Sequence, residues 1–249
     1  MSLHGPNARR PSGADRGSPE IRLYGAIGDR SGVVVDEFIK TLESLTATHL
    51  VLRINSPGGF VFDGIAIFEA LKRHPAHITA IVDGMAASAA SYILQAADER
   101  VMGRYSELMI HDAHIAVVGN ATEHDQAARQ LDRMSDTIAR IYADRAGGQV
   151  TTWREAMRAE TWYSAAEAVA AGLADRIDNT TKAAASLVFD LSPFRYAGRT
   201  SAPQPGLGAP PTRPRILPAV ARLDDRVRAV QVAAARRRRR TNLSTKGIR

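Results

Sequence analysis

Between residues 21 and 179, short β-rich apolar runs alternate with longer segments whose apolar residues recur at helical spacing. Strands separated by helices form parallel sheets, so this alternation predicts an α/β fold with helices covering a parallel sheet. The predicted strands are Ile21–Tyr24, His49–Ile54, Ile78–Val82, Glu107–His111 and Leu173–Ile177. The predicted helices are Val33–Leu45, Asp63–Arg73, Ala86–Ala97, Thr122–Ala146, Thr152–Ala159 and Ala165–Ala171.

Both ends of the chain lack this periodicity. Residues 1–20 are polar and rich in Pro and Gly, which predicts a flexible leader. Seven of the twelve prolines fall between Pro193 and Pro218, so we expect residues 180–249 to form a largely disordered tail, with a short basic helix over Leu217–Arg240. The predicted domain is therefore 21–179. Every residue singled out below for chemistry lies within it, so a chain ending at Asn179 should fold and keep its basic activity.

Charge separates the tail from the domain. The chain carries a net charge of +7, yet residues 182–249 hold fifteen basic and three acidic residues, which leaves −5 for the rest. The domain thus gives no reason to expect nucleic-acid binding. The tail, with Arg236–Arg240, would suit an acidic partner such as a capsid or scaffold surface or packaged nucleic acid, or it is a solvated extension without a role.

The amino-acid composition excludes several kinds of active site. The chain has no cysteine, which excludes disulfides, thiol nucleophiles and cysteine-based zinc sites. No apolar stretch approaches eighteen residues and the N-terminus has no apolar signal region, so we expect a cytoplasmic protein without membrane contact. We expect no metal and no cofactor, and no Gly-x-x-x-x-Gly-Lys-Ser/Thr motif supplies an ATPase.

Three local features indicate nucleophilic catalysis when taken together. Ser88 follows a strand, Gly84 and small residues at the start of a helix, where free N–H groups stabilise a developing negative charge. Gly58 and Gly59 follow another strand and let backbone N–H groups approach a ligand. His111 ends a third strand, and His is the usual base for a serine. Alone, each is ordinary: a packed serine, a turn, a core histidine.

These blocks resemble the signature blocks of the Clp protease proteolytic subunit family, in the same order and at similar spacing over about residues 21–179. The residues that carry the resemblance are Asn55-Ser-Pro-Gly-Gly59, Gly84-Met-Ala-Ala-Ser88, Met109-Ile-His111, Trp162-Tyr-Ser-Ala-Ala-Glu-Ala168 and Gly172-Leu-Ala-Asp175.

The resemblance implies a crotonase-like α/β fold of repeated β-β-α units with a protruding handle helix, Thr122–Ala146. It also implies heptameric rings, single or stacked, around a closed chamber. It identifies Ser88 as nucleophile and His111 as base. The N–H groups of Gly59 and Ala89 would form the oxyanion hole, and an extended peptide substrate would lie along a strip formed by Gly58, Phe60 and Val61 and the segment after His111.

The third catalytic residue of the family is normally Asp and here falls on Glu160. Glutamate can orient a histidine, but its extra methylene needs a different backbone position. Asp112 and Asp175 are fallback candidates. Asp112 adjoins the base in a strand and should point to the opposite side, and Asp175 is better explained as structural.

Several alternatives compete. A Ser-Lys protease would need a lysine near Ser88, whereas the chain has only Lys40, Lys72, Lys182 and Lys246. A crotonase-type acyl-CoA enzyme would share the glycine loop but has no use for this serine and histidine. A catalytically idle capsid-assembly or scaffolding ring would not need them either.

The prediction of a cellular role rests on resemblances in shorter stretches of the sequence. Ile21–Gly28, His74-Pro75 and Trp162-Tyr163 resemble prophage Clp-like proteases that mature phage heads, and the basic tail departs from the housekeeping form. A housekeeping subunit working with an ATP-driven unfoldase is the alternative.

Overall fold

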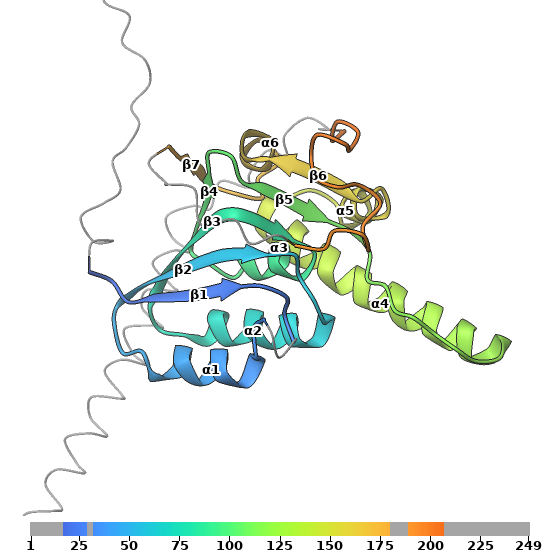
Figure 1. Ribbon diagram of the computed structural model, residues 1–249, viewed down its shortest axis with the longest axis horizontal. Helices are drawn as coiled ribbons and strands as arrows, with labels where there is room; N and C mark the ends of the chain where they lie inside the picture. Colours follow the sequence, from blue (N-terminus) through green and yellow to red (C-terminus); the bar gives the residue numbers. More distant parts are fainter. Residues whose placement is uncertain (1–16, 29–31, 180–188, 207–249) are drawn as a thin grey trace, which may run out of the picture. The chain divides into compact units, whose positions relative to one another are not determined.

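The computed structural model describes residues 17–28, 32–179 and 189–206. It confirms the predicted fold class, since five of the strands form a parallel path with helices packed beside them (Figure 1). The strands are β1 (Glu20–Tyr24), β2 (His49–Ser56), β3 (His77–Ala87), β4 (Glu99–Gly103), β5 (Glu107–Ile110), β6 (Thr161–Ser164) and β7 (Arg176–Asp178). The helices are α1 (Val35–Ser44), α2 (Val61–Arg73), α3 (Ala89–Leu94), α4 (Ala121–Ala146), α5 (Val150–Arg158) and α6 (Ala165–Ala170).

Strand β3 joins two parts of the sheet. The parallel path runs β1-β2-β3-β4-β7. The first half of β3 pairs with β4, and its second half, Met85–Ala87, pairs in parallel with β5, which pairs antiparallel with β6. The carboxyl ends of β3 and β5 therefore lie side by side, and catalytic groups in α/β sheets gather at such ends.

The predicted elements differ from the structure in three ways. The closing strand, predicted at Leu173–Ile177, is β7 at Arg176–Asp178. β3 continues through Gly84 to Ala87, where a turn and the start of a helix were predicted, and its extra residues create the edge that β5 uses. Strands β4 and β6 were not predicted. Both are short, and their apolar residues, such as Val101 and Trp162, become buried only through pairing with strands distant in sequence.

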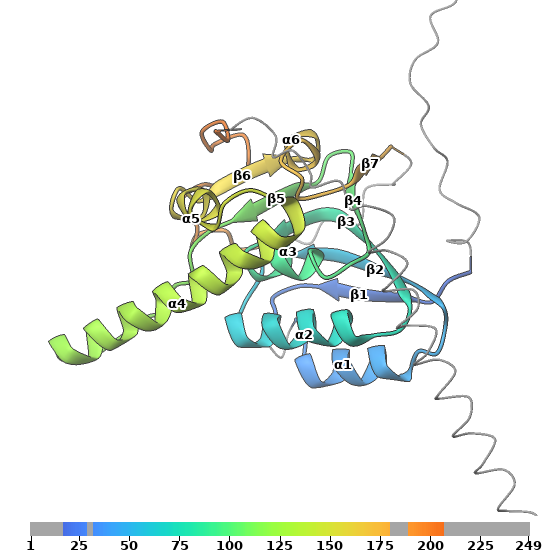
Figure 2. The ribbon, with the colours of Figure 1, turned by 180° about the vertical axis from the view of Figure 1, so that it is seen from behind.

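Helix α4 has two unlike halves. Its buried residues all lie in the second half, and they are Ser135, Ile138, Ala139, Tyr142 and Ala146. The first half projects beyond the sheet (Figures 1 and 2). Asn120 and Glu123 form a capping box at its free end, which stabilises a turn that has little packing. The protruding helix predicted from the sequence is thus present.

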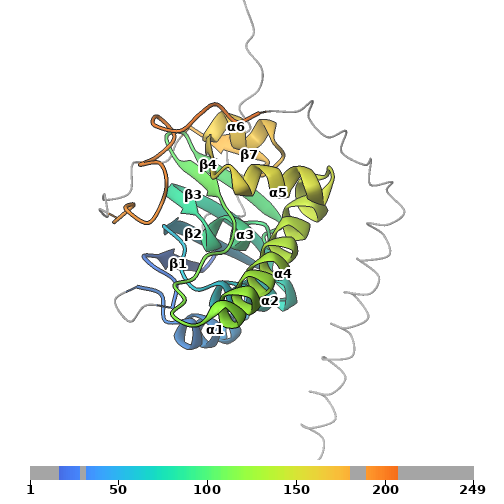
Figure 3. The same ribbon diagram turned by 90° about the vertical axis from the view of Figure 1, so that its right-hand side faces the viewer.

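Residues 189–206, which we call the strap, depart from the disorder expected after Asn179. Leu191, Phe194, Tyr196 and Ala202 pack on a small apolar cluster of Ala87, Met109 and Trp162. The strap lies on the face of the sheet opposite α3 and α4 (Figure 3). The prediction of disorder rested on proline content, but a segment without regular secondary structure can still be ordered when its side chains are buried. The predicted leader up to residue 16 and the basic helix over Leu217–Arg240 lie outside the described residues.

The described residues contain neither a membrane-spanning helix nor a cluster of metal ligands. No helix there is long and apolar enough to cross a membrane. No group of three or more His, Asp and Glu side chains among the same residues could hold a metal ion.

Candidate active site

Ser88 and His111 meet where β3 and β5 end. The parallel register places Ala87 opposite Met109, and the Ser88 N–H donates to the Met109 carbonyl at 2.9 Å. Two residues after Met109, His111 directly follows β5, and its Nε2 lies 2.7 Å from Ser88 Oγ. This is hydrogen-bond distance for a nucleophile and its base. The two side chains predicted from separate segments are therefore brought together by strand pairing.

The backbone at Ser88 is strained. Ser88 has φ 51° and ψ −121°, in a region that L-residues rarely occupy, and it is the residue immediately before α3. Such strain persists only where the surrounding structure imposes it. Here the strand before Ser88 and the fully buried helix after it, including Ala89 and Ala90, fix the turn. The turn presents the serine hydroxyl to His111.

The glycine pair closes around this turn. A Cβ on Gly58 would lie 2.6 Å from Ser88 Cβ and 2.8 Å from the Ala89 nitrogen, and one on Gly59 would lie 2.1 Å from the Ile27 carbonyl oxygen. Both positions also have positive φ. Only glycine fits either position, and the loop lies directly against the Ser88–Ala89 backbone.

The bridge to Ile27 orients Gly59. Ile27 donates to the Gly58 carbonyl at 2.7 Å and accepts from the Phe60 N–H at 3.1 Å. In a parallel bridge of this kind, the residue between the two partners directs its own N–H and C=O to the other side. Gly59 therefore turns its N–H away from Ile27, as a donor to a substrate oxygen would require.

The predicted substrate strip is less open than expected at Phe60–Val61. The Phe60 N–H donates a hydrogen bond to the Ile27 carbonyl, and the Phe60 carbonyl accepts one from the Gly64 N–H. The Val61 carbonyl accepts from Tyr92 Oη at 2.9 Å. These backbone groups cannot also pair with a substrate strand. What remains is the Phe60 ring, which is 67% exposed, together with that of Phe62 at 65%, a residue the sequence did not single out.

Glu160 lies near the base but is held by other groups. Its Oε1 accepts from the Tyr196 N–H at 3.0 Å and from Trp162 Nε1 at 3.3 Å, and its Oε2 accepts from the Arg195 N–H at 2.8 Å. Within the described residues no hydrogen bond joins it to His111. Its backbone has φ 51°, which marks a second strained position.

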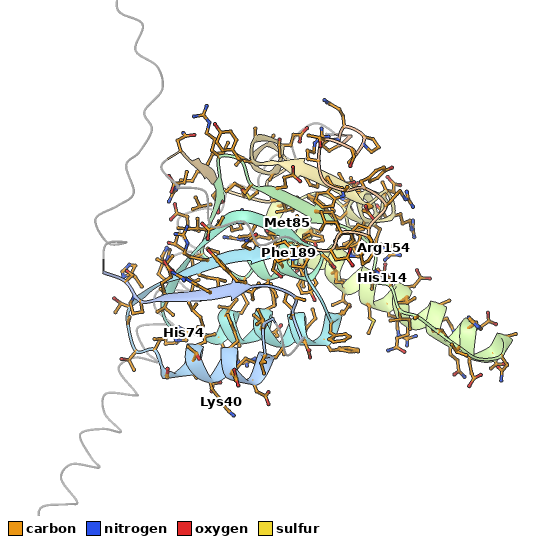
Figure 4. All side chains as sticks on the ribbon, viewed as in Figure 1. Lys40, His74, Met85, His114, Arg154 and Phe189 are labelled. Atoms are coloured by element: carbon orange, nitrogen blue, oxygen red, sulfur yellow. The ribbon has the colours of Figure 1, made fainter. Side chains whose placement is uncertain are left out.

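Burial dominates the electrostatics of His111. The pKa of His111 is lowered to about 4, mainly by burial and also by the neighbouring His114, while the negative charge of Glu160 opposes both. The ring centroids of His111 and His114 are 5.1 Å apart, and Phe194 lies edge-on to His111 at 5.5 Å. Figure 4 shows His114 at the end of the sheet from which α4 projects. A neutral imidazole can accept a proton from serine.

The two fallback acids have other partners. Asp112 pairs with Arg154 on α5 at 3.2 Å, and Arg154 also reaches Asp132 and Asp136 on α4. Asp175 accepts from the Arg100 side chain and backbone at 2.8 to 3.0 Å. Neither is hydrogen-bonded to His111 in the described part of the chain, and Asp175 has the structural role expected of it.

Comparison with known proteins agrees with this geometry. The family described as Clp protease matches residues 18–181. The chain belongs to the Clp protease family. It is similar to ATP-dependent Clp protease proteolytic subunits of Pleurastrum terricola (32% identical, covering 63% of this chain and 83% of that one) and Chlorella vulgaris (34%, covering 53% and 67%). A third, from Illicium oligandrum, is 35% identical, covering 53% and 67%.

Membership in the Clp protease family confirms the prediction of a serine-type endopeptidase with a ClpP-like fold. The structure also bears on the Ser-Lys alternative. The two lysines among the described residues, Lys40 on α1 and Lys72 on α2, are both exposed, and Figure 4 shows Lys40 on the outer side of α1. Neither is placed to serve Ser88.

The sequence missed the contribution of the strap to this site. Phe194, Arg195 and Tyr196 contact His111 or Glu160, although they lie in a segment expected to be disordered. The only signal available was the aromatic pair itself, Phe194 and Tyr196 with one residue between them, within a stretch otherwise rich in Pro, Gly and Ala.

Proposed function

We propose that Ser88, His111 and Glu160 form the catalytic triad of this endopeptidase, with the N–H groups of Gly59 and Ala89 as its oxyanion hole. The observation that carries the proposal is the 2.7 Å contact between Ser88 Oγ and His111 Nε2 at the ends of two paired strands. Neutral His111 suits the role of base, and the negative charge of Glu160 suits stabilisation of the imidazolium that forms.

Each residue then has a defined role in the reaction. His111 removes the proton from Ser88 Oγ as that oxygen attacks the peptide carbonyl carbon. The carbonyl oxygen becomes an oxyanion, which accepts hydrogen bonds from Gly59 and Ala89. His111 returns the proton to the leaving amine, and an acyl-enzyme remains on Ser88. Water, deprotonated by His111, hydrolyses the ester and restores the serine.

The exposed half of α4 supports assembly with other copies of the chain. A helix that projects from its own sheet leaves apolar residues such as Leu131 and Met134 only partly covered. We propose that this half contacts a second copy, in heptameric rings that enclose the active sites. The exposed rings of Phe60 and Phe62 would then face the substrate.

Within this class we propose a role in processing phage capsid or scaffold proteins. The resemblance of Ile21–Gly28 and Trp162-Tyr163 to prophage proteases supports it. Work with an ATP-driven unfoldase is the alternative. Cleavage of an assembled head precursor without ATP would favour the phage role, and a strict need for ATP and an unfoldase would overturn it.

The test of the triad begins with Ser88→Ala. We expect loss of peptide cleavage by about 10⁴-fold or more and no labelling by a fluorophosphonate, because the nucleophile is absent. Sedimentation velocity of the same variant should still show the ring. Labelling at wild-type level would contradict the assignment, and a wild-type chain that cleaves no peptide would favour the idle scaffolding ring.

A further inference from the structure

The Glu160 carboxylate is bound mainly by a segment that lies outside the family match. Two of its three hydrogen-bond donors are the successive backbone N–H groups of Arg195 and Tyr196 in the strap. The third is the indole of Trp162. Backbone donors on both oxygens fix the position and the rotation of a carboxylate, which a single side-chain contact does not.

The occupied positions leave room for the base. A carboxylate offers about four acceptor positions. Among the described residues, Oε1 has two donors and Oε2 has one, so with respect to this part of the chain an acceptor position remains on Oε2. The strap therefore satisfies most of the carboxylate while leaving it able to accept the Nδ1–H of His111.

The strap is anchored beyond Glu160. Arg199 donates from Nε and Nη2 to the two oxygens of Glu167, both at 2.7 Å, and its backbone N–H donates to Glu107 at 3.0 Å. This guanidinium lowers the pKa of Glu167 to about 2. Phe194 also packs edge-on against both His111 and Trp162. Bidentate pairing and ring packing hold residues 194–199 in one register over the site.

We infer that the strap positions the catalytic acid: the Arg195 and Tyr196 N–H groups hold the Glu160 carboxylate where it can serve His111. The inference rests on the proposed triad. Because Glu160 is one methylene longer than aspartate and leaves a strained backbone, it needs an external restraint that a shorter side chain would not. A chain ending at Asn179 lacks that restraint, so it should cleave poorly, contrary to the expectation from the sequence.

An inhibitory strap is the opposite reading, and the geometry disfavours it. The Ser88–His111 hydrogen bond is already formed at 2.7 Å with the strap in place. Within the described residues the strap makes no hydrogen bond to Ser88, Gly58 or Gly59. The strap contacts Glu160 and the His111 ring, and it does not occupy the glycine loop where a substrate would bind.

The test compares two substitutions at one exposed position of the full-length chain. Arg195→Ala and Arg195→Pro both remove the side chain, but only proline also removes the N–H donor. We expect kcat for a small fluorogenic peptide to be about tenfold lower in the proline variant than in the alanine variant, with similar KM. Fluorophosphonate labelling of Ser88 should slow in parallel, and thermal unfolding of both variants checks that they are folded.

A double-mutant cycle separates positioning from general damage. In a Glu160→Gln background the difference between proline and alanine at 195 should disappear, because the donor acts only through the carboxylate. A difference that persists there, equal rates for the two variants at 195, or a faster proline variant would each overturn the inference.

A second anchor variant covers the case in which proline prevents folding. Arg199→Gln should lower kcat, and Arg199→Lys should recover part of the loss. Wild-type kcat in Arg199→Gln would contradict the strap's role. If Glu160→Gln is impaired while the strap variants are not, the triad stands and only this inference fails; if Ser88→Ala stays active, the proposed function itself fails.

Discussion

The two partners proposed for His111, Ser88 and Glu160, are held by different parts of the chain. On the Nε2 side, Ser88 is placed by the register of β3 and β5 and by the glycine loop, all within the sheet. The proposed acid, Glu160, instead lies at a strained turn and is bound by backbone groups of the strap. The first arrangement is rigid because paired strands define it. The second depends on a segment without regular structure, so it should be the easier to loosen.

The largest effect on activity should come from a substitution beside Ser88, on the side of the site that the paired strands and the glycine loop define. Gly58→Ala would place a methyl group 2.6 Å from Ser88 Cβ, at a φ of 95° that alanine rarely adopts. The loop or the serine turn must shift, so we expect kcat/KM to fall about 10²- to 10³-fold while His111 stays in place. Peptide hydrolysis measures it. Gly148→Ala controls for backbone strain, because Gly148 also has a positive φ and a Cβ there would make only an ordinary van der Waals contact, 3.6 Å from Trp153 Nε1; equal losses in both variants would contradict a site-specific clash.

Glu160→Gln should have a smaller effect with two distinct parts. The plateau rate should fall about 10²-fold, because the imidazolium loses its charge partner. The negative charge of Glu160 raises the pKa of His111, so its removal lowers that pKa, and the acid limb of kcat/KM should move to lower pH. A slower enzyme with an unmoved acid limb would show that Glu160 does not act on the base and would redirect the role to another acid.

The contrast between the two sides also explains what could be predicted from the sequence. Ser88, His111 and the glycine pair each lie next to a strand with a clear apolar pattern, and the backbone rules at such ends are local. The parallel sheet and the long helix α4 were predictable for the same reason, since periodicity and caps are read within one segment.

The rest depended on contacts distant in sequence. β6 has only four residues and acquires its pairing from β5, more than fifty residues earlier. The strap has no periodicity and is ordered by Trp162, Met109 and Glu167, which no local pattern connects with it. The packed region therefore extends past Asn179, and the acid side of the site was only partly foreseen.

The smallest effect should come from exposing His111 to water without changing the charged groups around it. Phe194→Ala removes the ring that lies edge-on to His111, and burial is the main cause of the low pKa of His111. With water admitted, this pKa should rise from about 4 toward 6.5, while the charges that face the ring, His114 and Glu160, remain. The variant should therefore match the wild type near pH 8 and lose activity near pH 5, where the wild-type base is still neutral.

Stability should respond in the same window. An unfolded histidine takes up its proton near pH 6.5 and folded His111 near pH 4, so the stabilisation from the neutral base is present above 6.5 and is lost as the pH falls between these values. Phe194→Ala should narrow that loss, which thermal unfolding at pH 7 and pH 5 would measure. Tyr105→Ala, which removes an exposed aromatic side chain that has no part in the proposed site, is the control. If the acid limb of kcat/KM is the same in Phe194→Ala and in the wild type, the strap does not shield His111 from water. Phe194 would then have no part in lowering the pKa of His111.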